Sequence, residues 1–240
     1  MLKQWFKGRS IWLLAVTTVL IVGCGSPDHD PSEGLVASWR FDEGAGAIAA
    51  DASGHQNTAT ILNGAWGEGH TDNALAMDGG NDGIVTIPMS DSLRTTAGEI
   101  TVMAWTYRTA EHNVDILGHG YPTLFFGFHG PRFKWQFVRA NGRQMACYAD
   151  PKYVAGLDQW IHVAATYNGW IARLYANGEQ VCSKWTWGDI AMPDVPFTMS
   201  GYLDDSGRIV DEITGRIDDV RIYDRALSQA EIRRVAGLAN

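Results

Sequence analysis

The chain has 240 residues and a net charge of −8 at pH 7, with 45% hydrophobic residues, 11% aromatic residues and 27 glycines. A surface with an acidic excess repels phosphate backbones, so we expect no nucleic-acid partner. The length suits one β-sandwich domain and leaves little room for a second. The glycine and aromatic content favours short strands joined by tight turns.

Residues 1–23 have the pattern of an export signal. Three basic residues precede the apolar run Ile11–Val22, which is too short to span a bilayer comfortably. The run ends at Ile21-Val22-Gly23-Cys24, which resembles the lipobox of bacterial lipoproteins. This resemblance implies that residues 1–23 are removed and that Cys24 is acylated. An ordinary signal peptide or an uncleaved anchor is the alternative.

Residues 24–33 form a short segment of Pro, Gly, Ser and acidic residues, which is typical of a flexible tether. Lipoproteins kept at the inner membrane commonly carry Asp after the cysteine, whereas Gly25 and Ser26 follow Cys24 here. The lipoprotein resemblance therefore implies a protein of the bacterial cell envelope, at the outer membrane where the organism has one. The chain would be anchored to the membrane by its lipid and would not span it.

Residues 34–240 read as one all-β domain. In Leu35–Phe41 every second residue is apolar, as expected of a half-buried strand. Asn168-Gly169 and Asn177-Gly178 supply the positive φ angles that tight hairpins require. More than ten short strands predict two stacked antiparallel sheets. The further predicted strands are Ala74–Met77, Gly83–Ile87, Ile100–Tyr107, Pro122–His129, Arg132–Val138, Gln144–Tyr148, Trp160–Tyr167, Ala172–Ala176, Glu179–Trp185 and Gly215–Tyr223.

One short C-terminal helix is predicted after the last strand. Ser228 and Glu231 have the spacing of a capping box, in which each side chain bonds the backbone amide of the other residue. We expect Leu227, Ile232 and Val235 to pack this helix onto the sandwich.

Two cysteines remain once Cys24 is assigned to the lipid. Cys147 and Cys182 form an even pair in an exported chain, which favours a disulfide, with two buried free thiols as the alternative. A bridge closing about 35 residues stabilises a fold by about 3–4 kcal/mol when it is unstrained.

Seven segments, taken in order, resemble the laminin-G-like, concanavalin A-like jelly-roll family of bacterial exported proteins. They are Trp39–Gly44, Asp51–Gly54, Ala74–Gly80, Thr101–Trp105, Trp160–Gly169, Leu174–Gly178 and Gly215–Ser228. The resemblance implies a two-sheet antiparallel sandwich whose first and last strands lie side by side, which protects an otherwise open edge. It does not imply a particular ligand, because one fold hosts many functions.

Members of this family often hold a calcium ion near the rim of the sandwich. Ca²⁺ binds carboxylate, amide and carbonyl oxygens, and the family pattern points first to Asp51 and Asp218. Asp42 and Asn57 are the next candidates for one structural calcium ion. The alternative is that these carboxylates cap turns by accepting backbone amide bonds. Further oxygen donors near strand ends are Glu43, Asp78, Asn81 and Asp82.

Carbohydrate recognition would use exposed aromatic rings, on which sugar faces stack. Trp185 and Trp187 lie near Gly188 at the exit of a strand and are the better exposed candidates. Tyr121 and Trp135 are further candidates. However, Phe133, Trp135 and Phe137 share one face of a strand, so packing in the core is the alternative for these rings.

No arrangement of catalytic residues is evident. Glucanases of related fold carry Glu-x-Asp-x-x-Glu on one strand, and the nearest look-alike, Val114–His119, lacks both glutamates. The pairs Asp211-Glu212 and Asp218-Asp219 would point to opposite faces of a strand, and no Gly-x-Ser-x-Gly or His-Glu-x-x-His motif occurs. The sequence thus predicts a binding module and no enzyme, with carbohydrate as the expected ligand. The alternatives are a structural or adhesive protein that binds an envelope or surface protein, and a divergent glycan-degrading enzyme.

Overall fold

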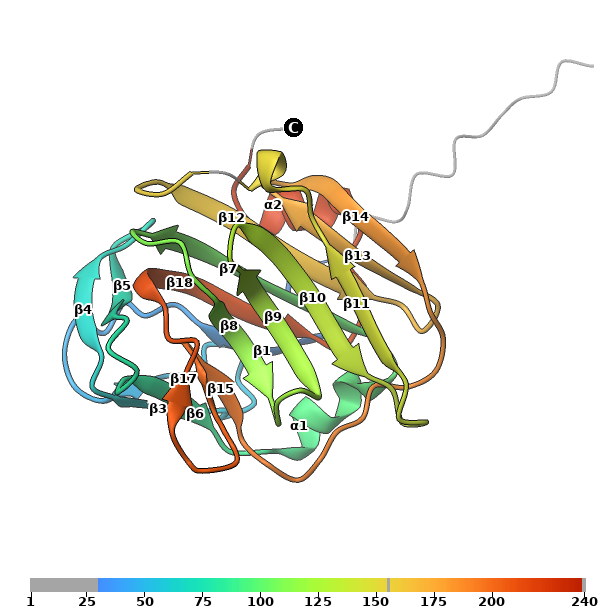
Figure 1. Cartoon of the computed structure of the whole chain (residues 1–240), viewed down its shortest axis with the longest axis horizontal. Helices are drawn as coiled ribbons and strands as arrows, with labels where there is room; N and C mark the ends of the chain where they lie inside the picture. Colours follow the sequence, from blue (N-terminus) through green and yellow to red (C-terminus); the bar gives the residue numbers. More distant parts are fainter. Residues whose placement is uncertain (1–29, 155, 239–240) are drawn as a thin grey trace, which may run out of the picture.

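Two antiparallel sheets are stacked face to face in the computed structural model, which describes residues 30–154 and 156–238 (Figure 1). The predicted all-β jelly-roll sandwich is therefore confirmed. The predicted signal peptide, Cys24 and most of the tether lie outside the described residues. Among the described residues, no helix has the length and apolarity needed to cross a bilayer.

The first sheet has the strand order β14-β13-β12-β7-β18-β5-β4, and β1 also pairs with β18. Its strands are β14 (Glu179–Trp185), β13 (Ile171–Ala176), β12 (Trp160–Tyr167), β7 (Ile100–Arg108), β18 (Thr214–Tyr223), β5 (Asn73–Asp78), β4 (Ala65–Glu68) and β1 (Leu35–Trp39).

The second sheet has the strand order β11-β10-β9-β8-β15-β6-β3-β2, and β8 to β11 lie toward the viewer in Figure 1. Its strands are β11 (Gln144–Tyr148), β10 (Arg132–Val138), β9 (Leu124–His129), β8 (Val114–His119), β15 (Phe197–Met199), β6 (Ile84–Ile87), β3 (Ala59–Leu62) and β2 (Ile48–Ala49). A separate ribbon joins β16 (Tyr202–Leu203) to β17 (Ile209–Val210).

The first and last strands lie side by side, as the family resemblance implied. In the ladder of β1 and β18, Leu35 lies opposite Tyr223 and Trp39 lies opposite Val220. The N-terminal half of β18 pairs with β5 on the same flank, while β7 occupies the other flank. The last strand is therefore an interior strand of its sheet, and all its neighbours come from much earlier in the sequence.

The core fills the space between the two sheets with large rings. Trp39, Phe41, Trp135 and Tyr167 are fully buried, and Phe137 packs on Tyr167 across the sandwich with ring centroids 4.7 Å apart. A disulfide between Cys147 and Cys182 joins β11 to β14, the edge strands of the two sheets. The predicted bridge is confirmed, and it fastens the sheets together at one open side.

Helices are short and lie at the ends of the strands. The predicted C-terminal helix is α2 (Gln229–Val235), and its capping box between Ser228 and Glu231 is confirmed. Leu227 and Ile232 pack on Tyr175 and Tyr223 of the first sheet, so α2 covers part of that sheet's outer face. Three single helical turns were not predicted from the sequence: α1 (Asp91–Arg94), η1 (Thr95–Ala97) and η2 (Pro151–Tyr153).

Candidate functional site

Three tryptophans protrude where β14 ends beside the turn between β12 and β13. Trp170, Trp185 and Trp187 have exposed fractions of 63%, 75% and 59%. Trp185 lies opposite Ile171 in the ladder of β13 and β14, and the amide of Thr186 donates to the carbonyl of Trp170 at 3.0 Å. These contacts bring the three residues side by side. We call them the tryptophan edge.

The tryptophan edge confirms the exposure predicted for Trp185 and Trp187 and adds Trp170 to them. Trp170 follows the Asn168-Gly169 turn, where no strand face is available to bury its ring. That position after a tight turn was the sequence signal that could have identified it. The guanidinium of Arg139 lies 5.8 Å from the Trp187 ring and donates to the Trp187 carbonyl at 3.2 Å. The positively charged guanidinium of Arg139 therefore lies next to the exposed tryptophan rings.

Tyr121 belongs to a second aromatic group, on the outer face of the second sheet. Its ring stacks on Tyr202 with centroids 4.0 Å apart, and both line a pocket of about 250 Å³. The remaining lining residues are Thr86, Gly120, Val195, Pro196, Thr198 and Leu203. Thr123, two residues after Tyr121, accepts a bond from Val138, and Arg139 follows Val138. The segment that carries Tyr121 is thus bonded to the end of β10, next to Arg139.

Two charged side chains lie beneath the outer surface of the second sheet. Asp115 and Lys134 both lie opposite Gly127, on either side of β9, and both are buried. Burial and the charge of Asp211 raise the pKa of Asp115 well above its ordinary value, and burial lowers the pKa of Lys134. Both oxygens of the Asp115 carboxyl group are without hydrogen-bond partners among the described residues. Both charged side chains are therefore enclosed beneath the outer surface of this sheet.

The prediction that Trp135 binds sugar is wrong. It is fully buried between the sheets, where it packs on Phe126 and Phe137. Because side chains alternate along β10, the face that carries Phe133, Trp135 and Phe137 is the core face. The alternative considered for these rings, core packing, is the one that the structure shows.

The carboxylate of Asp51 connects neighbouring segments of the chain through hydrogen bonds. Its Oδ1 accepts the amides of Ser38 and Ser53, and its Oδ2 accepts the amide of Asn57 and the hydroxyl of Ser53, at 2.8–2.9 Å. These four donors occupy the lone pairs that a carboxylate offers. The buried Asn57 is equally engaged: its side chain donates to the carbonyl of Val36 and accepts from Ser90.

Asp42 and Asp218 line a different feature, a shallow cavity of about 200 Å³. Oδ2 of Asp218 accepts the amides of His70 and Thr71 at 2.9 and 3.2 Å, although burial raises the pKa of this carboxyl group to about 7. Among the described residues, neither Asp42 nor Asp51 nor Asp218 belongs to a group of three His, Cys, Asp or Glu side chains close enough together to hold a metal ion. Calcium at these residues stays a prediction.

A different acidic group does converge. Asp78, Asp82 and Glu212 place carboxylate oxygens within 4.8 Å of one another. Asp78 and Asp82 were among the oxygen donors noted in the sequence, but Glu212 was considered only as half of an acidic pair. Glu212 lies two residues before the start of β18 and is distant in sequence from the two aspartates, so only the folded chain brings it to them.

The family of the chain follows from its sequence. Residues 78–233 match the family model of the concanavalin A-like lectin/glucanase superfamily. The chain belongs to this superfamily, as the resemblance implied. Among curated proteins, none matches the sequence significantly.

Several solved structures share the fold. The binding domain of Paraclostridial Mosquitocidal Protein 1 has a TM-score of 0.69 at 14% identity, covering 86% of this chain and 52% of its own. The binding domain of botulinum neurotoxin DC in complex with SialylT has a TM-score of 0.67 at 13% identity, covering 88% and 53%. Domain 4 of AbnA, an extracellular arabinanase from Geobacillus stearothermophilus, in complex with arabinotriose, has a TM-score of 0.61 at 19% identity, covering 84% and 98%.

The chain spans about half the length of the toxin binding domains that it resembles. At these identities the likeness shows a shared fold. The similar structures are binding domains of toxins and one domain of a glycosidase.

Proposed function

We propose that the protein is an extracytoplasmic carbohydrate-binding module that takes its ligand on the tryptophan edge. The observation that carries this proposal is the exposure of Trp170, Trp185 and Trp187, each more than half accessible although the domain has a large core to receive such rings. Adjacent exposed aromatic side chains mark interaction sites on soluble domains. Indole faces are flat and apolar with a polar N–H, which suits the CH-rich faces and hydroxyl groups of sugars.

The shared fold supports a binding role. The arabinanase domain, which this chain covers almost entirely, was solved in complex with arabinotriose, and one toxin binding domain, about half of which is covered, was solved in complex with SialylT. A further toxin binding domain was solved in complex with rat synaptotagmin II, so a protein partner is the second class of ligand to be tested. The arginine beside Trp187 adds a donor that hydroxyl or carboxylate groups of a glycan could use.

Binding without catalysis is part of the same proposal. Hydrolysis of a glycosidic bond needs two carboxyl groups that face the bond from defined distances. Asp115 and Asp211 lie close enough for the charge of Asp211 to raise the pKa of Asp115, but the Asp115 side chain is fully buried and cannot face a glycosidic bond. Release of reducing sugars from algal or plant polysaccharides by the purified protein would support the glycan-degrading alternative instead.

Attachment to the cell envelope completes the proposal. The lipobox-like segment before Cys24 supports a lipid anchor, and Gly25 and Ser26 support an outer-membrane address where two membranes exist. We expect a Cys24→Ser variant to lose metabolic labelling with a fatty acid and to leave the membrane fraction. Equal labelling of the variant and the parent chain would contradict the anchor.

A glycan array and affinity measurements test the ligand site. We expect Trp185→Ala and Trp187→Ala each to weaken binding of the retained polysaccharide at least tenfold, or about 1.4 kcal/mol, while the melting temperature stays almost unchanged. Tyr153→Ala is the matched control, because Tyr153 is an exposed ring outside the tryptophan edge. Tyr121→Ala shows whether the neighbouring pocket contributes to the same ligand.

Two outcomes would contradict the proposal. Unchanged polysaccharide binding in both tryptophan variants would remove the tryptophan edge as the site. Retention of no polysaccharide, together with capture of an envelope protein that requires the same tryptophans, would favour the structural or adhesive role.

A further inference from the structure

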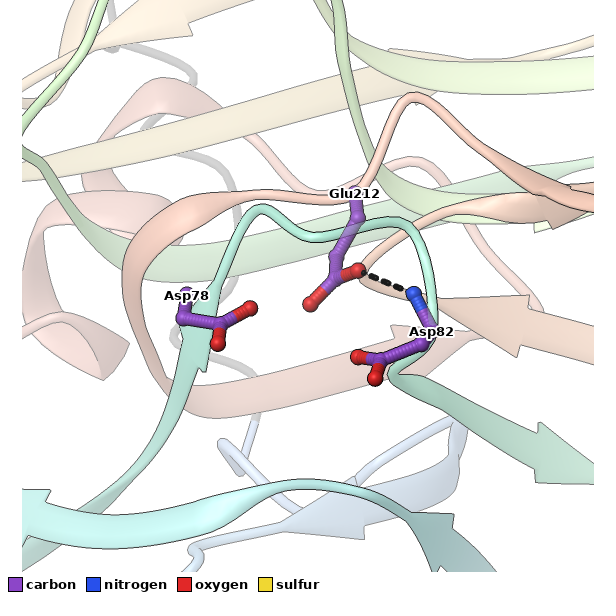
Figure 2. A group of neighbouring side chains, drawn as sticks. All are labelled: Asp78, Asp82 and Glu212. Atoms are coloured by element: carbon purple, nitrogen blue, oxygen red, sulfur yellow. Dashed lines mark hydrogen bonds between the residues drawn. The ribbon is translucent and has the colours of Figure 1, made fainter.

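Three carboxylates from distant parts of the sequence meet on the edge of the sandwich. Asp78 ends β5, Asp82 lies in the loop before β6, and Glu212 lies in the segment that enters β18. Figure 2 shows the three carboxylate groups directed toward a common space. One oxygen from each group lies within 4.8 Å of one oxygen from each of the others. Like charges at such spacing repel, and a cation bound between them would relieve this repulsion.

Glu212 is the buried member of the group, with only 1% of its surface exposed. Its Oε2 accepts the amides of Asp82 at 2.9 Å and Gly83 at 3.2 Å. Its Oε1 is buried and has no hydrogen-bond partner among the described residues. In Figure 2 this second oxygen points into the space between the two aspartates. A buried carboxylate oxygen without a partner is costly, and a bound cation would satisfy it.

Basic side chains do not supply this positive charge. In the part of the chain that the structure describes, the hydrogen bonds to these three carboxylates come from backbone amides, including that of Gly80 to Asp78 at 2.8 Å. Arg208 lines a cavity with Asp82, but its guanidinium is bonded to Asp204 at 2.7 Å. The two aspartates are exposed, so an ion arriving from solvent would reach the space between them.

We propose that Asp78, Asp82 and Glu212 bind a calcium ion. The donor set consists of carboxylate oxygens alone, which selects a hard cation and disfavours zinc or copper. Calcium accepts irregular geometry and six to eight oxygen ligands, so water can complete the shell on the exposed side. The site differs from the region of Asp51 and Asp218, to which the family resemblance pointed, and it does not depend on the proposed carbohydrate function.

An ion at this place would connect the loop between β5 and β6 to the segment before β18. These two segments already share one bond, from the Glu212 amide to Oδ1 of Asn81 at 3.3 Å. Calcium would therefore raise the melting temperature and protect the amides of Asp82 and Gly83 from hydrogen exchange.

The test is calcium binding by the purified full chain after removal of metal with a chelator. We expect one calcium per chain by elemental analysis after dialysis, and a rise in melting temperature on addition of Ca²⁺. Asp82→Asn should weaken calcium binding at least tenfold, and Glu212→Gln should do the same. The side chain of Asp82 is exposed and makes no hydrogen bond among the described residues, so Asp82→Asn folds even where Glu212→Gln does not.

Asp205→Asn is the matched control, since Asp205 is also an exposed acidic residue but lies outside the cluster. Its calcium affinity should equal that of the parent chain. Absence of calcium from the parent chain, with no shift in melting temperature, would overturn the proposal. So would a tenfold loss in Asp42→Asn with no loss in Asp82→Asn, because the ion would then occupy the other acidic region.

Discussion

His162 shows how strongly burial controls a titratable side chain in this protein. It lies in β12, fully enclosed, with its ring 5.3 Å from that of Trp105. Burial, with smaller contributions from Arg221 and His70, lowers its pKa from 6.5 to about 3. The folded chain therefore keeps this imidazole neutral over a range of pH in which the unfolded chain protonates it.

A pH dependence of stability follows. Between pH 6.5 and about 3 the unfolded state binds a proton at His162 that the folded state does not, so the free energy of unfolding falls as pH decreases. His162→Phe keeps a ring of similar volume and removes the proton. We expect urea unfolding at pH 7, 6, 5 and 4 to show a shallower loss of stability in the variant. Parallel pH curves for the two chains would contradict the assignment.

The tryptophans divide into two groups that a substitution series can separate. Trp135→Ala removes a fully buried ring, so we expect the free energy of unfolding to fall by about 3–5 kcal/mol. Trp185→Ala removes a ring that is three-quarters exposed and should change stability by less than about 0.5 kcal/mol. Urea denaturation of both variants checks this contrast. A large loss in Trp185→Ala would show that its ring packs in the folded chain.

At the scale of elements, the disulfide between β11 and β14 is the one covalent link between the sheets among the described residues. The bridge joins residues that are 35 positions apart in the sequence, so its removal increases the conformational entropy of the unfolded chain. We expect the double variant Cys147→Ala, Cys182→Ala to lose about 3–4 kcal/mol in free energy of unfolding. The reduced parent chain should unfold at the same urea concentration as the double variant. Equal midpoints for the oxidised parent and the variant would refute this role.

Strands with clear alternation were predictable from the sequence. Leu35–Phe41 and Arg132–Val138 place large apolar residues at every second position, and the structure has β1 and β10 there. The strand β8 was missed because all six of its residues are buried, including Asp115 and His119, so no two-residue period marks it. Two-residue strands such as β16 and β17 are too short to carry any period.

The candidate sites were predictable where a side chain's exposure follows from local position. Trp185 and Trp187 stand at a strand end, and their exposure could be inferred from the sequence. The proximity of Glu212 to Asp78 and Asp82 could not be inferred from the sequence, because it depends on the pairing of β18 with β5 in the sheet. Asp51 looked like a calcium ligand, but the donors that occupy its oxygens come from three separate residues of the fold.

For the whole molecule, the match to the superfamily covers less of the chain than the folded unit does. It begins at residue 78, whereas β1 to β4 and nearly all of β5 precede that residue. A chain of residues 78–233 would keep β7 but lack β1 and nearly all of β5, which pair with the other flank of β18, and it would lack the buried rings of Trp39 and Phe41. We expect it to show no cooperative thermal transition by circular dichroism, whereas residues 30–238 unfold cooperatively. A sharp transition in the shorter chain would show that β1 to β5 are dispensable.

The pairing of β1 with β18 also sets the order in which the molecule can be completed. Leu35 has no ladder partner until Tyr223 is available, so a chain delivered N-terminus first carries an unfinished sheet through nearly all of its synthesis. Contacts between such distant residues form late because the loop that joins them must first close. The topology thereby delays closure of the core until the last strand arrives.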